Sequence, residues 1–349
     1  MVWQMNKRFP VILDMDPGVD DALAIILALK SGLLDIKAIT ICGGNVGLDQ
    51  CALNALKTIR IIDPNSSIPV ARGASRPVTR SPFRAGGIHG PDGLGGVKQM
   101  YPDPPVSDLD PRNGVDLILD AARLYSNELV IIATGPLTNI ALAISKDPEA
   151  MRSIGRICWM GGSFATTGNI TPVAEFNAFC DPEAAQEVLS FGVPMTVAGL
   201  DACMLCPFSQ EELYQEVSRT PSPVGAFAKA ITGMYMDFYH RQENFLGCYL
   251  HDPLAVAIAM WPDIITKSQP HHVQVVTHGG VAQGMTIIDR RPRNPWLNCM
   301  CQKALGRVGA EELDVLRGFS MIDSPPHVDV VLEVDGTEFL ERFKKTCFS

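Results

Sequence analysis

Short apolar runs alternate with longer segments of helical periodicity through the first two hundred residues of the chain. Runs of four to eight apolar residues are typical of buried strands, and apolar residues recurring every three or four positions are typical of helices. The strands predicted in this way are Val11–Asp14, Ile36–Cys42, Ile68–Ala71, Leu129–Thr134, Arg156–Met160 and Met195–Gly199. The helices predicted between them are Leu48–Ile62, Val115–Tyr125, Pro136–Ser145 and Pro182–Phe191. This alternation indicates an α/β fold, with a parallel sheet between two layers of helices.

The pattern changes at two places along the chain. Residues 72–112 are rich in Gly and Pro and predict a long loop, which in a compact domain is usually a lid, a binding loop or disordered. After Pro207 the pattern is mainly helical. The elements predicted there are helices at Glu211–Val217, Val224–Phe245 and Pro253–Met260, strands near Val273–Val276, Gly284–Asp289 and Val328–Val334, and a final helix from Thr337. We expect a single domain over residues 1–349, with a helical, mobile appendage.

Composition and charge exclude several classes of partner. The net charge of −9 argues against binding to nucleic acid or to an anionic membrane. The N-terminus lacks the apolar segment of a secretory signal, and the longest apolar stretch, Ala22–Leu29, is too short to span a bilayer. The ten cysteines mostly stand singly in apolar runs, as expected for reduced thiols of a cytoplasmic protein. Cys203 and Cys206 form one C-x-x-C, but no second pair completes a zinc site.

Four carboxylates follow the first predicted strand in the sequence VILDMDPGVDDA. They are Asp14, Asp16, Asp20 and Asp21, and the turn at Pro17-Gly18 is expected to fold the last two back toward the first two. Like charges this close repel one another, so a bound cation is expected, and oxygen ligands without His or Cys favour Ca²⁺. Helix capping by Asp20 and Asp21 is an alternative, but it leaves Asp14 and Asp16 unexplained.

A strand that ends in D-x-D also resembles the haloacid dehalogenase type of phosphatase. In that family the first Asp attacks phosphate, the second acts as acid and base, and Gly-Thr or Gly-Val usually follows. Here Pro17-Gly18 and two further Asp residues follow the second Asp. The phosphatase is therefore the weaker alternative.

Other polar residues fall at the same edge of the predicted sheet. Asn45 and Thr134 follow predicted strands, and the segment GNITPVAEFN supplies Asn169, Glu175 and Asn177 between apolar neighbours. Amides and carboxylates placed in this way suit the hydroxyl groups of a sugar, although an ordinary polar loop is the alternative. Further along, Asp252-Pro253 in YLHDPLAVA is a good helix start. A lone His such as His251 before a helix is more often a packing residue than a catalytic one.

Together these motifs resemble the nucleoside hydrolases, the inosine/uridine-preferring family of N-ribohydrolases. The similarity runs through nearly the whole chain, in DMDPGVDDA, GGN, HGPDGLG, ATGPLTNIA, GNITPVAEFN, HDPLAVA, GMTIIDRR and VDVVLEVD. The first motif combined with AEFN and HDP is the most specific part of the resemblance. The implied fold is an open, mostly parallel Rossmann-like α/β sheet with a helical cap over the active site, and the implied assembly is a homodimer or homotetramer.

The resemblance implies calcium-dependent hydrolysis of ribonucleosides to ribose and free nucleobase. The implied calcium ligands are Asp16, Asp21, the carbonyl of Thr134 and Asp252, with a water on the metal as the nucleophile and Asp16 as the general base. The implied ribose-binding residues are Asp20, Asn45, Asn169, Glu175, Asn177 and Asp252. His251 is implied to lie beside the nucleobase and to assist its departure. An activated water, negative charge beneath the sugar and a proton donor at the base suit an oxocarbenium-like transition state.

Substrate choice follows less directly from the resemblance. His251 stands where the purine-specific branch has a tryptophan, and His89 lies in the glycine-rich loop, as in the inosine/uridine and pyrimidine-preferring branch. Candidates for contacting the base are Tyr235, Tyr239, His240 and Arg241, whereas Trp261 is expected to lie too far away. Met15 and the long stretch 292–327 depart from the family pattern, and Arg290-Arg291-Pro292-Arg293 is expected to be a solvated loop or a subunit contact. A non-catalytic nucleoside- or sugar-binding protein is the remaining alternative; the intact set of Asp16, Asp21, His251 and Asp252 argues against it.

Overall fold

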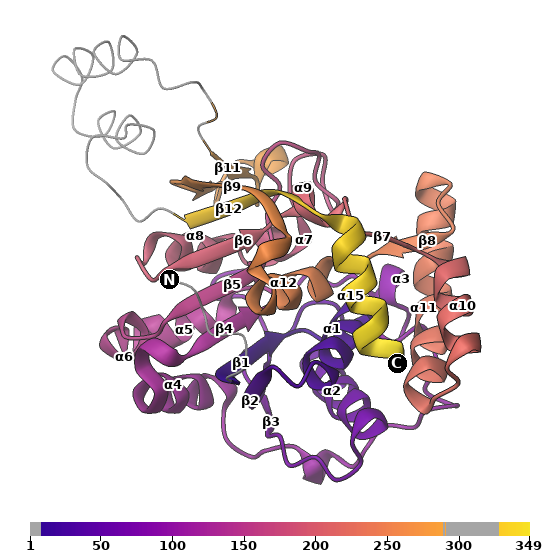
Figure 1. Cartoon of the computed structure of the whole chain (residues 1–349). Coiled ribbons are helices and arrows are strands. Elements are labelled where there is room, and N and C mark those ends of the chain that lie inside the picture. The colour runs from indigo at the N-terminus through magenta and orange to yellow at the C-terminus, as the bar shows by residue number, and fades with distance from the viewer. Residues whose placement is uncertain (1–7, 289, 291–327) are drawn as a thin grey trace, which may run out of the picture.

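Eight strands form one sheet at the centre of the computed structural model, which describes residues 8–288, 290 and 328–349 (Figure 1). The strand order is β3-β2-β1-β4-β5-β6-β12-β9, and each pairing is parallel except that of β9 with β12. The strands are β1 (Phe9–Met15), β2 (Leu34–Ile41), β3 (Val70–Arg72), β4 (Val130–Ala133), β5 (Arg156–Met160), β6 (Met195–Ala198), β9 (Ile265–His271) and β12 (Val328–Val334). The predicted α/β fold with a mostly parallel sheet is confirmed.

Helices cover both faces of the sheet, each over its own apolar core. One face carries α1 (Val19–Lys30), α2 (Leu48–Ile62), α12 (His251–Met260) and α15 (Gly336–Phe348). The other carries α4 (Gly114–Tyr125), α5 (Thr138–Lys146), α6 (Pro148–Arg152) and α8 (Pro182–Ser190). Side chains of a strand point alternately to the two faces, so Leu13 of β1 enters the first core while Ile12 enters the second. Both faces are covered, which explains why the strands are continuous apolar runs.

The last third of the chain departs from the predicted strands. β9 was not predicted, because it is a largely exposed edge strand whose sequence, ITKSQPH, has few apolar residues and contains Pro270. The strands predicted near Val273–Val276 and Gly284–Asp289 are shorter, as β10 (Gln274–Val275) and β11 (Thr286–Ile287). They pair with each other outside the main sheet. The stretch 292–327, Asp289 and most of the basic cluster lie outside the described residues.

The helical segment after Pro207 packs against the main body of the protein. A short hairpin of β7 (Pro207–Ser209) and β8 (Gly247–Tyr249) encloses α10 (Gln210–Arg219) and α11 (Pro223–Glu243). α11 contacts α1, α2 and α15, and Lys344 of α15 forms an ion pair with Glu212 of α10 at 3.0 Å. The expected appendage is therefore packed against the rest of the fold. α11 lies against α1, which begins within the acidic turn, the segment 14–21 that contains the four carboxylates.

Two further expectations concern membranes and thiols. None of the helices that the structure describes is both long and apolar enough to cross a membrane. The eight cysteines within the described ranges, Cys203 and Cys206 among them, are buried free thiols. Burial raises the pKa of these two thiols, so both are protonated at neutral pH.

Candidate active site

The predicted site residues from the first half of the chain meet at one edge of the sheet. β1 leads into Asp16, β2 leads toward Asn45, and β4 leads into Thr134. The strand order reverses between β1 and β4, and ligands of open α/β sheets bind beyond the carboxyl ends of the strands at such a point. The edge marked by the acidic turn is therefore the expected place for a ligand.

Asp21 holds the acidic turn in its shape. One oxygen of its carboxylate accepts a hydrogen bond from the backbone N–H of Gly18, at 2.9 Å, and so caps the start of α1. Its other oxygen accepts a hydrogen bond from the Thr134 hydroxyl, at 2.7 Å. The helix-capping alternative is thus correct for Asp21. It does not account for Asp14 and Asp16, whose side chains accept hydrogen bonds from Thr40, Asn139 and Asn45 instead.

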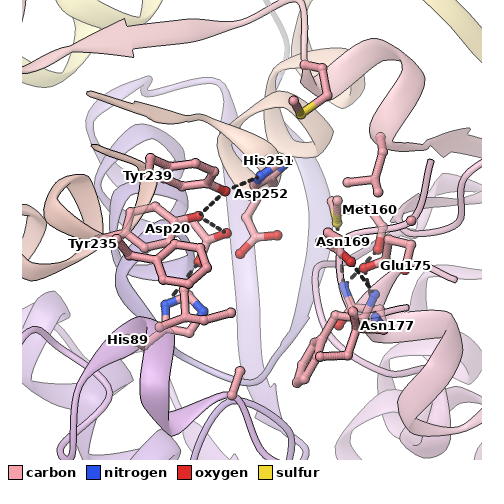
Figure 2. Close-up of a pocket in the computed structure, with 18 of the residues that line it drawn as sticks. Asp20, His89, Met160, Asn169, Glu175, Asn177, Tyr235, Tyr239, His251 and Asp252 are labelled. Carbon is pink, nitrogen blue, oxygen red and sulfur yellow. Dashed lines mark hydrogen bonds and ion pairs between the residues drawn. The ribbon is translucent and has the colours of Figure 1, made fainter. Parts of the chain in front are cut away.

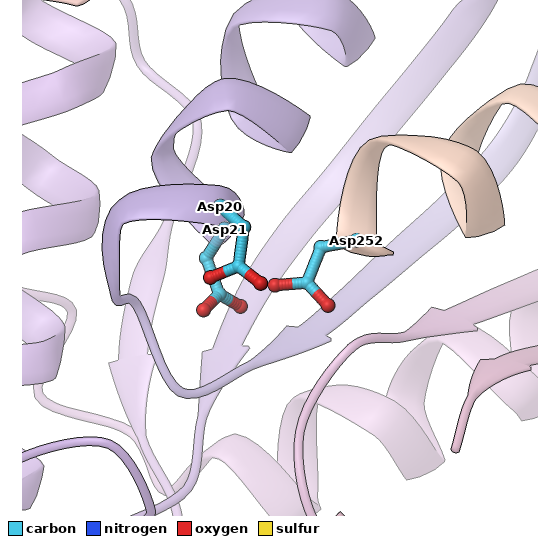
Figure 3. Close-up of side chains that lie close together, drawn as sticks. All are labelled: Asp20, Asp21 and Asp252. Atoms are coloured by element: carbon cyan, nitrogen blue, oxygen red, sulfur yellow. The ribbon is translucent and has the colours of Figure 1, made fainter. Parts of the chain in front are cut away.

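Asp20, Asp21 and Asp252 form a group of buried carboxylates whose ligand oxygens lie within 4.8 Å of one another (Figure 3). Burial raises the pKa of Asp20 and of Asp21 to about 6, and burial together with the charge of Asp20 raises the pKa of Asp252 well above its usual value. Three ionised groups this close need a cation or protons to be stable. A donor set made only of oxygens fits a hard ion such as Ca²⁺. The predicted metal ligands included Asp16 in place of Asp20, whereas the structure groups Asp20 with the other two.

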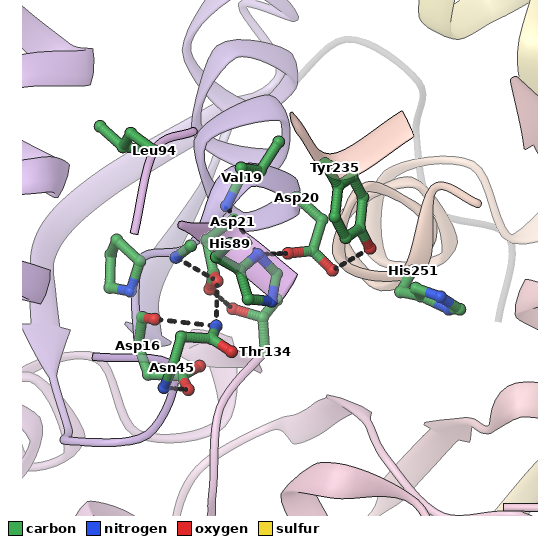
Figure 4. Close-up of polar contacts among 12 residues, drawn as sticks. Asp16, Val19, Asp20, Asp21, Asn45, His89, Leu94, Thr134, Tyr235 and His251 are labelled. Carbon is green, nitrogen blue, oxygen red and sulfur yellow. Dashed lines mark hydrogen bonds and ion pairs between the residues drawn. The ribbon is translucent and has the colours of Figure 1, made fainter. Parts of the chain in front are cut away.

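Asp16 lies beside this group and is held by Asn45 (Figure 4). Oδ2 of Asp16 accepts a hydrogen bond from the backbone N–H of Asn45 at 2.8 Å, and the amide of Asn45 reaches the Asp16 carbonyl and the Asp21 carboxylate. The other carboxylate oxygen, Oδ1, is buried and has no hydrogen-bond partner among the described residues. Burial and the charge of Asp21 raise the pKa of Asp16. A buried carboxylate oxygen without a hydrogen-bond partner can accept a proton or bind a cation.

Two glycines, which were not among the predicted site residues, leave room for the Asp16 carboxylate. A Cβ atom on Gly44 would lie 2.0 Å from Oδ2 of Asp16, and one on Gly135 would lie 2.7 Å from Oδ1. Neither distance is compatible with a side chain at these positions. Each glycine follows a strand, next to a predicted site residue, and lies within a motif of the family resemblance, GGN for Gly44 and ATGPLTNIA for Gly135.

Asp14, the first carboxylate of the acidic motif, does not belong to the group of three. Its side chain accepts hydrogen bonds from the Thr40 hydroxyl at 2.6 Å and the Asn139 amide at 2.8 Å. Asp14 lies on β1, where successive side chains point to opposite faces of the sheet. Burial raises its pKa to about 7. The expectation that all four carboxylates of the turn face one another is therefore wrong for Asp14.

The opposite wall of the site carries Asn169, Glu175 and Asn177 (Figure 2). Glu175 caps α7 (Phe176–Cys180) and accepts backbone N–H bonds from Gly162, Asn177 and Ala178. Asn177 donates both amide hydrogens, to the carbonyl of Thr134 at 2.7 Å and that of Met160 at 3.0 Å. Its remaining acceptor is Oδ1. Asn169 accepts from the Phe176 N–H, so its amide nitrogen remains to meet a ligand.

Two tyrosines of α11 connect Asp20 with His251. The Tyr235 hydroxyl lies 3.4 Å from Oδ2 of Asp20 and 3.4 Å from the Tyr239 hydroxyl, which lies 2.9 Å from Nε2 of His251. The His89 ring stacks on Tyr235, with ring centroids 5.2 Å apart. Burial lowers the pKa of His89 and of His251 to about 4, so both are neutral at neutral pH. Nδ1 of His251 has no hydrogen-bond partner within the described part of the chain.

These walls enclose a cavity of about 360 Å³, a size that suits a small polar ligand. The predicted residues that line it are Asp20, Asn45, His89, Thr134, Asn169, Glu175, Asn177, His251 and Asp252. Asp16 and Asp21 lie beneath this lining, as the partners of Asn45 and Thr134. Tyr235 and Tyr239 line the cavity, whereas His240 and Arg241 on the same helix are exposed and do not. The apolar lining, which was not predicted from the sequence, includes Ile88, Phe176, Met204 and Phe238.

Comparison with known proteins agrees with this arrangement. The sequence profile described as inosine-uridine preferring nucleoside hydrolase matches residues 11–341. A pyrimidine-specific ribonucleoside hydrolase RihA of Citrobacter koseri is 39% identical over 284 residues, which are 80% of this chain and 88% of the relative. RihA of an Escherichia coli O1:K1 strain is 37% identical over the same shares of the two chains.

Solved structures give the same result. A purine-preferring ribonucleoside hydrolase from Gardnerella vaginalis superposes with a TM-score of 0.82 and 32% identity, over 97% of this chain and 98% of its own. A plant nucleoside hydrolase, PpNRh1, superposes with a TM-score of 0.83 and 27% identity, over 98% and 99%. The fold and the site define an N-glycosyl hydrolase. The chain belongs to the inosine-uridine preferring nucleoside hydrolase family and is a ribonucleoside hydrolase.

Proposed function

We propose that the chain uses calcium and water to cleave the N-glycosidic bond of ribonucleosides, and that pyrimidine nucleosides are its preferred substrates. The observation that supports this function is the buried group of Asp20, Asp21 and Asp252, beside Asp16, at a cavity of about 360 Å³. A non-catalytic binding protein has no need of so costly a concentration of buried carboxylates together with His251. A phosphatase would need a cationic side chain near its phosphate, and the described lining of the cavity contains neither Lys nor Arg.

Asp16 is the proposed general base. Its unpartnered Oδ1 is buried, and Asn45 fixes the carboxylate through Oδ2, so the free oxygen can take a proton from the attacking water. Asp21, Asp252 and the Thr134 carbonyl are the proposed calcium ligands together with Asp16, and Asp20 lies within reach of the same position. When bound, calcium supplies positive charge that neutralises the carboxylates and makes a water more acidic.

The ribose is proposed to lie between the acidic turn and the opposite wall. Asp20, Glu175 and Asp252 offer carboxylate acceptors to its hydroxyls, Asn177 offers Oδ1, and Asn169 offers its amide nitrogen. Asn45 lines the same part of the cavity. Negative charge close to the sugar also stabilises the positive charge that develops as the glycosidic bond breaks. The same residues therefore serve both binding and catalysis.

The nucleobase is proposed to lie against α11, next to His89, Tyr239 and His251. The neutral His251 ring carries one N–H, and together with the Tyr239 hydroxyl it can donate a hydrogen bond to the departing base and stabilise the negative charge that develops there. The apolar side chains of Ile88 and Phe238 provide a surface for the flat ring. Pyrimidine preference rests on the RihA relatives, which are named as pyrimidine-specific.

A first experiment measures ribose release from uridine, cytidine, inosine, adenosine, guanosine and uridine 5′-monophosphate, with and without a strong calcium chelator. We expect release to be fastest from uridine and cytidine and to fall by at least roughly 10²-fold with the chelator, because the carboxylates lose their counter-ion. Added Ca²⁺ should restore it. The nucleotide should react poorly, because its phosphate meets several carboxylates and no cationic side chain in the described lining. Calcium binding without release from any substrate would instead support the binding-protein alternative.

A glycine substitution tests the close packing around Asp16. Gly135→Ala places a Cβ atom 2.7 Å from Oδ1 of Asp16 and 2.9 Å from the Cys42 thiol, so the carboxylate must move. We expect kcat for uridine to fall by about 10²-fold, since small displacements of a catalytic group have effects of this size. The matched control is Gly233→Ala on α11, where a Cβ atom meets nothing within 4 Å. Equal activities of the two variants would show that the room beside Asp16 is not needed.

The remaining expectations concern assembly and location. A homodimer or homotetramer and a cytoplasmic location stay predictions. Light scattering of the purified protein would determine the assembly.

A further inference from the structure

Asn54 is a fully buried amide on α2 that joins two segments of the site from behind. Its Nδ2 donates one hydrogen bond to the carbonyl of Pro17, at 3.0 Å, and one to the carbonyl of Asp92, at 2.8 Å. Pro17 belongs to the acidic turn, between Asp16 and the start of α1. Asp92 belongs to the glycine-rich loop, three residues after His89. One side chain outside the cavity lining therefore connects the acidic turn to the loop that carries His89.

The loop segment beyond His89 is a tightly closed unit. The Asp92 carboxylate accepts backbone N–H bonds from Leu94, Gly96 and Lys98, at 2.9, 2.8 and 3.0 Å. The N–H of Gly95 donates to the carbonyl of His89, at 2.8 Å. Since these bonds tie the segment together, a shift of Asp92 relative to α2 moves His89 with it.

The orientation of His89 depends on the same contact between loop and turn (Figure 4). Its Nδ1 accepts a hydrogen bond from the backbone N–H of Val19, the first residue of α1, at 3.2 Å. The neutral ring must therefore carry its hydrogen on Nε2, which makes that nitrogen a donor. The ring also stacks on Tyr235. If the loop moves away from the acidic turn, His89 loses the N–H that fixes its tautomer.

Asn54 is itself fixed by a neighbour one helical turn away. Nε2 of Gln50 donates to Oδ1 of Asn54, at 3.0 Å, so the two amide hydrogens of Asn54 are directed to the two carbonyls. Every polar atom of the Asn54 amide is thereby paired. A smaller side chain at this position leaves two buried carbonyls without a donor, and such groups are costly to leave unsatisfied.

We propose that Asn54 is a positioning residue, which holds the His89 loop on the acidic turn and so places His89 against the nucleoside. This proposal rests on the proposed role of His89 in substrate binding. Loss of the two hydrogen bonds lets the loop separate from the turn, so the effect falls mainly on KM. Asn54 does not contact the substrate, and its whole effect on activity passes through His89.

A double-mutant cycle with uridine tests this proposal. We expect Asn54→Ala to lower kcat/KM by about tenfold, chiefly through KM, and by no more than about twofold when His89 is already alanine, because coupled residues are not additive. Amide hydrogen exchange of residues 88–98 should become faster in Asn54→Ala. The matched control is Thr58→Val, which removes a buried hydroxyl on the same helix; among the described residues this hydroxyl bonds to the carbonyl of Asn54 alone. It should leave both kcat/KM and loop exchange within about twofold of the wild type.

The outcomes separate this proposal from the proposed function. Equal losses with and without His89, or unchanged loop exchange, would overturn the positioning role, and so would a His89→Ala variant with wild-type kcat/KM. A wild-type protein that releases no ribose would overturn the proposed function instead, while loop exchange would still test Asn54. If Asn54→Ala does not fold, Asn54→Ser keeps one donor and should show a smaller loss in the same cycle.

Discussion

Asp16→Asn is expected to lower kcat for uridine by roughly 10³–10⁴-fold while leaving the protein folded, because it removes the proposed general base and the charge of one proposed calcium ligand. An asparagine keeps the shape of the side chain and can still accept the N–H of Asn45 through an oxygen at the position of Oδ2. It cannot take a proton from water at neutral pH. The loss should appear in single-turnover measurements, where product release does not contribute.

Thermal unfolding without calcium separates this effect from misfolding. Burial and the charge of Asp21 raise the pKa of Asp16 in the folded protein, so the ionised form destabilises the fold at neutral pH. The Asp16→Asn variant lacks this charge, and it should melt at the same temperature as the wild type or higher. Asp14→Asn is the matched control, because Asp14 is buried two residues earlier, on β1, but bonds to Thr40 and Asn139. Comparable losses of kcat in the two variants would contradict the role of Asp16.

The sequence predicted the sheet well because its strands are buried on both faces. Continuous apolar runs such as VILD and VIIA have no other favourable environment, and each is followed by a helical pattern. β9 could not be predicted from its sequence, because an edge strand pairs on one side only and can be polar. The packing of α10 and α11 against the main body could not be predicted for a different reason. Their periodicity shows that each has an apolar face, but not which surface that face covers.

The candidate site was predictable where residue type alone carries the chemistry. Clustered carboxylates and the HDP motif mark a site because buried charge is costly without a function. What Gly135 and Asn54 contribute depends on distances to Asp16 and Asp92, and those distances arise only when remote segments meet. The prediction for Asp14 was wrong for a similar reason. The charge pattern of the sequence groups Asp14 with the other carboxylates. In the structure the Asp14 side chain lies on the face of β1 where it contacts Thr40 and Asn139.

His251→Ala is expected to lower kcat/KM by roughly 10²-fold for uridine and by less than about threefold for a nitrophenyl riboside. The uridine base leaves as a poor anion unless it receives a proton, whereas nitrophenolate is stable without one. Tyr239 also loses its hydrogen bond to His251 in this variant, since the two side chains are 2.9 Å apart, and keeps its hydrogen bond with Tyr235. Tyr239→Phe should therefore show the same selectivity for substrates with a smaller effect, because His251 retains its own N–H.

The comparison of the two substrates determines what His251 does. A loss confined to uridine assigns His251 to the departure of the base, through the donor pair that it forms with Tyr239. Equal losses on both substrates would mean that His251 only shapes the cavity, or that its removal disturbs the neighbouring Asp252. Calcium affinity distinguishes these two cases, because Asp252 belongs to the group of three carboxylates and His251 does not. An unchanged affinity together with a uridine-specific loss is the result we expect, since the proposed donors to the base are His251 and Tyr239, which are not members of the group of three carboxylates.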